Sequence, residues 1–150
     1  MKLAEALQQR SDLNRNIAQL KQRLQYNVIV QEGEKPAENP DDLLKELDAC
    51  IVQLEELIKR INLTNCKTVI EGKTLTEWIG EKDCLKIKID AYRETVSRAS
   101  NVCGRYSRTE IKQISAVNVR ELQKKVDSMS AQLRKVDNLI QQSNWITELA

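Results

Sequence analysis

Residues 41–63 read DDLLKELDACIVQLEELIKRINL, and an apolar residue recurs there at every third or fourth position. This spacing is that of one buried face of an α-helix. The main apolar row consists of Leu43, Leu47, Cys50, Leu54, Leu57 and Ile61. A second row, made of Leu44, Ile51 and Ile58, widens the face. A face of this width suits the core of a helix bundle better than the seam of a two-stranded coiled coil.

The start of this helix carries the expected signals. Asn39 is placed as an N-cap, Pro40 takes the first helical position, and Asp41 and Asp42 lie against the positive end of the helix. The preceding residues, 32–40, are rich in Glu, Gly and Pro and predict a loop. The sequence therefore predicts a helix over about 41–63 that follows a turn of the chain.

Three further helical patterns cover about 2–26, 75–102 and 119–143. Arg10 falls on the apolar seam of the first pattern, and Lys82 falls on the seam of the second. A charged residue on such a seam more often fixes register or extends to solvent than binds a ligand. Asn118 is predicted to cap the last helix, and we expect Trp145 to hold down the segment that follows it.

Short extended segments are predicted between the helices. Residues 68–73 are predicted to be extended with a turn at Gly72, and residues 28–30 and 111–117 are rich in β-branched side chains. In an up-down helix arrangement the first and third connections lie at the same end. We therefore predict that 28–30 and 111–117 pair as a small ribbon, with the bases Arg105, Arg108 and Lys112 close to the acids Glu32, Glu34 and Glu38.

Together these patterns predict an all-α fold, an antiparallel four-helix, coiled-coil-like bundle of long helices with short extended segments at the junctions. An aromatic content of 3% without any Phe fits aliphatic seams better than a β-sandwich. The length predicts a single helical domain, 1–150. No segment approaches the roughly 18 uninterrupted apolar residues of a membrane span or resembles a signal peptide, so we expect a cytoplasmic protein.

Charge is unevenly distributed although the formal net charge is only +2. Residues 31–60 hold nine acids against four bases, and residues 82–125 hold eleven bases against five acids. We interpret these segments as complementary within the fold or across an oligomer. Nucleic-acid binding is the alternative, but it calls for a contiguous basic stripe with interleaved aromatics, and the sequence has neither.

The sequence argues against an enzyme and against a cofactor or metal site. The chain has no histidine, which removes the commonest general base and the commonest metal ligand. The glycines are isolated, so no phosphate-binding loop is predicted. The four cysteines, Cys50, Cys66, Cys84 and Cys103, are too widely spaced for a chelating or redox pair, and we interpret them as thiols rather than as a disulfide or zinc site. Cys103 is the best placed nucleophile, but an inert seam thiol is the preferred interpretation.

One polar cluster is a candidate site. Arg105, Tyr106, Ser107 and Arg108, with Lys112 close behind, combine two guanidiniums, a phenol and a hydroxyl where a helical pattern stops. Such a set can bind a phosphate or carboxylate. The alternative, which we prefer, is a structural junction or interface with ion pairs to the acidic loop.

Several short stretches resemble one protein family: Met1–Leu7, Val30–Glu34, Arg60–Asn65, Thr74–Glu77, Tyr106–Lys112 and Asn144–Thr147. In combination they resemble the septicolysin-like family of small uncharacterised bacterial helical proteins, over essentially the whole chain. The resemblance implies a helical protein with no established activity, whose family label comes from a cytolysin. It therefore supplies one alternative function, a membrane-active, pore-forming cytolysin.

The predicted function is that of a non-enzymatic intracellular helical scaffold or protein-interaction protein. The second apolar row of residues 41–63 exceeds what three neighbouring helices need to cover, so we expect a homo-oligomer. An unknown protein partner is also expected. The mixed charges and the lack of a long apolar segment argue against nucleic-acid and membrane partners.

Overall fold

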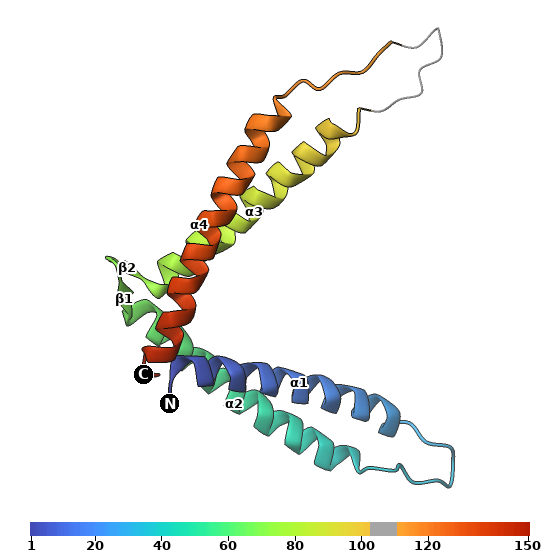
Figure 1. The fold of residues 1–150 in the computed structure, drawn as a ribbon. Coiled ribbons are helices and arrows are strands. Elements are labelled where there is room, and N and C mark those ends of the chain that lie inside the picture. The colour runs from blue at the N-terminus through green and yellow to red at the C-terminus, as the bar shows by residue number, and fades with distance from the viewer. Residues whose placement is uncertain (103–110) are drawn as a thin grey trace. The chain divides into compact units, whose positions relative to one another are not determined.

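The computed structural model describes residues 1–102 and 111–150. Four long helices dominate these residues: α1 (Leu3–Asn27), α2 (Pro40–Lys67), α3 (Leu75–Ser100) and α4 (Val119–Ile146) (Figure 1). Between α2 and α3 lie two short strands, β1 (Val69–Ile70) and β2 (Lys73–Thr74). The predicted all-α class and the four predicted helices are confirmed.

The chain divides into two compact units. The first comprises Met1–Thr74 and Gln142–Ala150, and the second comprises Leu75–Gln141. The second boundary falls inside α4, whose last turn belongs to the first unit. The packing of all four helices into one antiparallel bundle stays a prediction, and so does the single domain 1–150.

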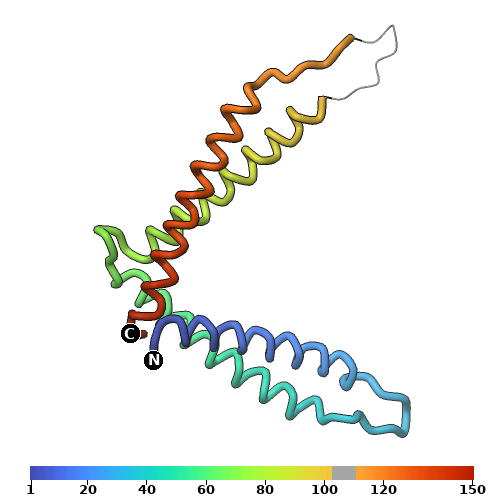
Figure 2. Tube along the Cα trace, in the orientation of Figure 1, coloured from blue at the N-terminus to red at the C-terminus, as the bar shows by residue number. Residues whose placement is uncertain are grey.

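In the first unit α1 and α2 lie side by side as a hairpin along most of their length (Figure 2). The contact is made by one aliphatic face of each helix. Its most deeply buried members are Leu3, Ala6, Leu13 and Leu20 of α1 and Leu43, Leu57 and Ile61 of α2. Arg10, the charged residue on the α1 seam, is half-buried. The main apolar row predicted for residues 41–63 therefore lies in the core of this hairpin.

The connection between α1 and α2 is fixed by a small polar network. The buried Asn27 side chain donates to the carbonyl of Arg23 at 2.8 Å and accepts from the Glu38 N–H at 2.9 Å. The guanidinium of Arg23 binds the Glu38 carboxylate through two nitrogens, one of them at 3.0 Å. The Asn39 side chain accepts from the Asp41 N–H at 3.0 Å, which confirms it as the N-cap of α2.

The predicted extended segment at 68–73 is confirmed as a two-residue hairpin. Ile70 pairs with Lys73 and Val69 pairs with Thr74 in an antiparallel ladder. The turn places Glu71 at φ 49° and Gly72 at φ +80°. A positive φ has no steric cost for glycine, which explains why Gly72 stands in the turn.

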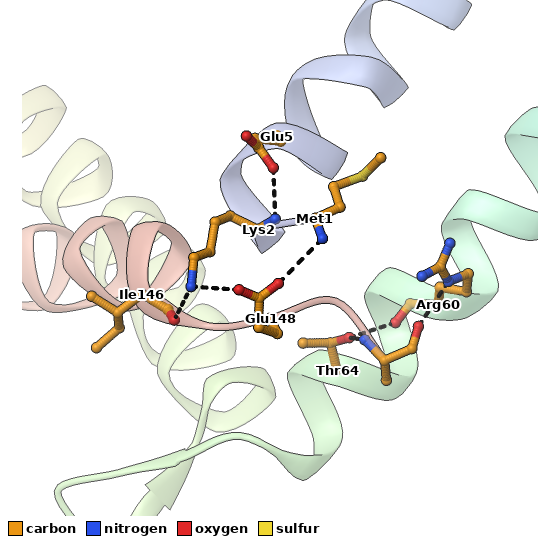
Figure 3. Close-up of polar contacts among 8 residues, drawn as sticks. Met1, Lys2, Glu5, Arg60, Thr64, Ile146 and Glu148 are labelled. Carbon is orange, nitrogen blue, oxygen red and sulfur yellow. Dashed lines mark hydrogen bonds and ion pairs between the residues drawn. The ribbon is translucent and has the colours of Figure 1, made fainter.

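The two ends of the chain are joined in the first unit (Figure 3). The Leu3 N–H donates to the Thr147 carbonyl, and the Leu149 N–H donates to the Met1 carbonyl, both at 2.9 Å. Lys2 Nζ binds the Glu148 carboxylate at 2.6 Å and the Ile146 carbonyl at 3.1 Å. These contacts tie the segment after α4 to the start of α1.

The same segment also reaches α2. The Ala150 N–H donates to Thr64 Oγ1 at 2.9 Å, and Arg60 Nε donates to the Ala150 carbonyl at 2.7 Å. Leu149 is buried, whereas Trp145 keeps 64% of its surface exposed. The prediction that Trp145 holds this segment is therefore wrong: backbone pairing and Leu149 hold it, because the indole faces solvent.

In the second unit side chains connect α3 with residues 119–141 of α4, and Arg93 Nη2 of α3 donates to Ser130 Oγ of α4 at 3.4 Å. The unit's most buried aliphatic residues are Leu75 and Ile89 of α3 and Val126, Val136 and Ile140 of α4. Lys82, whose side chain is 19% exposed, forms an ion pair with Asp137 of α4. The charged residue on the α3 seam thus connects the two helices, as expected for a residue that fixes register.

The predicted ribbon between 28–30 and 111–117 is wrong, because neither segment forms a strand. Val28 continues the end of α1, with its N–H bonded to the Leu24 carbonyl at 3.0 Å. Residues 111–117 remain irregular up to Asn118, whose side chain caps α4 by accepting from the Glu121 N–H at 3.2 Å. The β-branched side chains of these segments therefore did not produce strands, because β-propensity depends on context.

Candidate interaction surface

The polar cluster predicted from the sequence lies mostly outside the described residues. Arg105, Tyr106, Ser107 and Arg108 belong to that part of the chain, and Cys103 does too. Lys112 is described and is exposed in the segment that leads to α4. The anion-site hypothesis and the structural-junction alternative therefore both stay predictions.

An open groove of about 810 Å³ lies beside the C-terminal part of α3. Its lining combines Glu94 and Arg98 with aliphatic residues of the segment that precedes α4, Ile114, Ala116 and Val117. Among residues 1–102 and 111–150, its lining includes no cysteine, and the chain has no histidine.

Among the described residues, no cluster of three or more Cys, Asp or Glu side chains is arranged to hold a metal ion. Cys50 is half-buried on the core face of α2, and Cys66 and Cys84 are exposed. Nor does any described helix combine the length and the apolar character needed to cross a membrane.

The most distinctive surface lies on α2. The second apolar row, Leu44, Ile51 and Ile58, remains exposed after α1 has packed, with 45%, 45% and 37% of the residue surface accessible. The three residues are spaced by seven positions, so they follow one another along one side of the helix. We call this set the α2 row. It borders the half-buried Leu47 and Leu54, which connect it to the hairpin core.

The α2 row stays exposed because α1 is too narrow to cover it. The face of α1 offers a single seam, and that seam covers the side of α2 that carries Leu43, Leu57 and Ile61. At about 100° per residue, the α2 row lies roughly a quarter turn away from that side. A single neighbouring helix therefore buries only part of the apolar face of α2.

Charged side chains border the α2 row on its solvent side. Lys59 binds Glu55 at 2.6 Å, and Lys45 approaches Asp42 at 3.8 Å, each pair within one turn of α2. The Lys59 ammonium, by hydrogen bond and charge, lowers the pKa of Glu55 below its usual value. All four side chains are more than 60% exposed, so these pairs are weak and can exchange partners.

A model of a family of unknown function, DUF6847, matches residues 10–149. The chain belongs to the DUF6847 family. No curated protein matches it. The solved structures include a similar chain described as a functionally unknown conserved protein from Corynebacterium diphtheriae. It is 40% identical, the match covers 100% of this chain and 99% of that one, and the TM-score is 0.94.

These comparisons place the DUF6847 chain beside a protein of the same fold but attach no activity to it. The resemblance to the septicolysin-like family is not tested by them and stays a prediction. Of the candidate features, the α2 row was visible in the sequence as a second apolar row. The Asn27 network and the joined termini were missed, since no local pattern signals contacts between residues 11 or 147 positions apart.

Proposed function

We propose that this member of the DUF6847 family is a non-enzymatic helical interaction protein that self-associates through α2. The observation that carries the proposal is the exposed α2 row, Leu44, Ile51 and Ile58. Aliphatic side chains in a continuous row on a rigid helix are typical of an interface rather than of scattered surface residues. Burying such a row removes apolar area from water at about 25 cal/mol per Å².

The proposal extends to the cell biology predicted from the sequence. The protein acts as an intracellular scaffold, and a further protein partner is expected besides the second copy. An antiparallel four-helix bundle within one chain is the other way to cover the α2 row. The membrane-active alternative rests on the septicolysin-like resemblance alone, and dye release from liposomes is the measurement that would make it primary.

Mass by light scattering and sedimentation at high micromolar concentration tests self-association. We expect the native protein to exceed the monomer mass. Ile51→Glu places a carboxylate in the α2 row and is expected to weaken the oligomer about a hundredfold, because the charge must be buried in each copy. Ile87→Glu, on an exposed isoleucine of α3, is the matched control and should change the affinity less than about threefold.

A native protein that remains monomeric at these concentrations would overturn the proposal. We expect both variants to fold, since the replaced residues are 45% and 70% exposed, and helical content measured by circular dichroism checks this.

A further inference from the structure

We propose that the α2 row pairs with the α2 row of a second copy of this chain, with the two helices antiparallel. This inference rests on the proposed self-association and adds its surface, its direction and its register. It follows from the apolar row together with the order of charges beside it.

The row runs along the part of α2 that is free to receive another helix. Leu44, Ile51 and Ile58 cover two heptads of α2 and are each more than a third exposed. A two-fold axis perpendicular to the helices brings the same row of both copies together, which is the usual geometry of a homodimer. A second copy therefore supplies a surface that matches the row in length and in chemistry.

The charges beside the row are arranged in an order that favours antiparallel pairing. Along the solvent side of the row lie Asp41, Lys45, Asp48, Glu55 and Lys59. Asp48 lies near the two-fold axis, opposite the partner's uncharged Val52, and the other four form the pairs. In an antiparallel pair, the numbers of residues that face each other have a constant sum. With a sum of 100, Asp41 faces the partner's Lys59, and Lys45 faces the partner's Glu55. The two-fold axis repeats both contacts, so four opposite-charge pairs flank the apolar row.

The same register interleaves the apolar side chains. In this register Leu44 lies opposite residue 56 of the partner, so the partner's Ile58 is two residues away, about 3 Å along the helix. Ile51 lies equally close to the partner's Ile51, beside the two-fold axis. The apolar row and the charges thus call for one and the same register.

Parallel pairing lacks this complementarity. In a parallel pair the two-fold axis runs along the helices, so the charged side of the row in one copy lies beside the α1 side of the row in the other. Asp41, Lys45, Glu55 and Lys59 then do not meet one another, and the four opposite-charge pairs that favour the antiparallel direction are lost. Antiparallel pairing also sets the two helix dipoles in opposition. The lysines can reach across, because the Lys45 and Lys59 side chains are 80% and 63% exposed.

A double-mutant cycle on the dimer dissociation constant tests the register. We expect Lys45→Glu and Glu55→Lys each to weaken the dimer about tenfold, and the double variant to regain affinity to within about threefold of the native protein. Within one chain the two residues are ten positions apart, about 15 Å along the helix. Sites this far apart act additively unless they meet, so coupling reports a contact between copies.

Disulfide trapping tests the direction, in a background with serine at all four native cysteines. Antiparallel pairing predicts that Leu44→Cys mixed with Ile58→Cys gives a mixed disulfide dimer. Leu44→Cys alone should remain unlinked, because its copies lie about 18 Å apart along the helices. Parallel pairing predicts the opposite result for both samples.

The outcomes separate this inference from the proposed function. A monomeric native protein overturns self-association, and the pairing of α2 with it. A dimer that tolerates Ile51→Glu retains self-association but overturns α2 as the interface. A dimer with additive charge variants, or with Leu44→Cys linked to itself, overturns the antiparallel register alone.

Discussion

The two helical hairpins of this chain are held together by different means. The α1–α2 hairpin is fixed at one end by Asn27 and the Arg23–Glu38 pair and at the other by the joined termini. The α3–α4 hairpin is connected partway along its helices by Lys82–Asp137. Only α2, among the described helices, keeps a continuous exposed aliphatic row beside its buried one.

This difference shows where an interface can arise without loss of the fold. In α2 one apolar row stabilises the hairpin and the other is not needed for it. In α3 the single seam is used for packing, and its exposed Ile87 stands apart from the seam. A helix with two rows can therefore serve the core and a partner together, and the two roles can be separated by substitution.

The largest expected effect separates the two rows of α2. Ile61→Ala removes a side chain that is 1% exposed in the hairpin core and should lower the free energy of unfolding by about 2–5 kcal/mol. Ile58→Ala, in the α2 row, should cost less than about 1 kcal/mol in the monomer but should weaken self-association. Urea unfolding at low protein concentration measures both.

Equal losses from the two substitutions would show that the α2 row is part of the core of the monomer. The tryptophans help to assign the loss, since Trp78 lies in the second unit and Trp145 in the first. Replacing either by Phe leaves a fluorescence signal from the other unit.

Much of the hairpin architecture was predictable because it depends on local patterns. The predicted start of the second helix, at 41, lies one residue from the observed start at Pro40, since Asn39 and Pro40 mark it. The second apolar row was likewise visible in the sequence. Its exposure was not, because periodicity gives the faces of a helix but not the number of neighbours that cover them.

The errors arose where distant segments meet. Trp145 was predicted to anchor the last segment because an indole is large and apolar, but Leu149 is the buried residue and the backbone pairs with Met1 and Leu3. Residues 28–30 were predicted as a strand from β-branched side chains. A strand needs a partner at the same place, and the sequence does not identify one.

A smaller effect is expected at the hairpin connection. Asn27→Ala removes the acceptor of the Glu38 N–H and the donor to the Arg23 carbonyl, and Asn27 is 7% exposed. Leaving these partly buried groups without partners should cost about 1–3 kcal/mol. Asn27→Asp keeps the acceptor and should cost less. Hydrogen exchange of the Glu38 amide checks the assignment, because its protection should fall in Asn27→Ala.

A loss of stability without faster exchange at Glu38 would place the role of Asn27 elsewhere in the hairpin. Among residues 75–102 and 111–141, the structure describes no network like that of Asn27 between α3 and α4. The described part of that hairpin therefore offers no substitution comparable to Asn27→Ala.

The smallest effect concerns pH and the Arg23–Glu38 pair. The hydrogen-bonded guanidinium of Arg23 lowers the pKa of Glu38 below its usual value, and Lys2 lowers the pKa of Glu148 in the same direction. A carboxyl group whose folded pKa lies below its unfolded value stabilises the fold above the unfolded pKa. This stabilisation is lost as the pH falls through the folded pKa.

We therefore expect Glu38→Gln to lower the thermal midpoint slightly at neutral pH and to lose this effect progressively below about pH 4.5. Because both partners are substantially exposed, raising the salt concentration should reduce the difference at neutral pH. In an Arg23→Gln background the same substitution should have little pH-dependent effect, since the ion that lowers the Glu38 pKa is gone. A pH dependence that persists in that background would assign the stabilisation to another neighbour, such as the Asn27 network, rather than to the Arg23 charge.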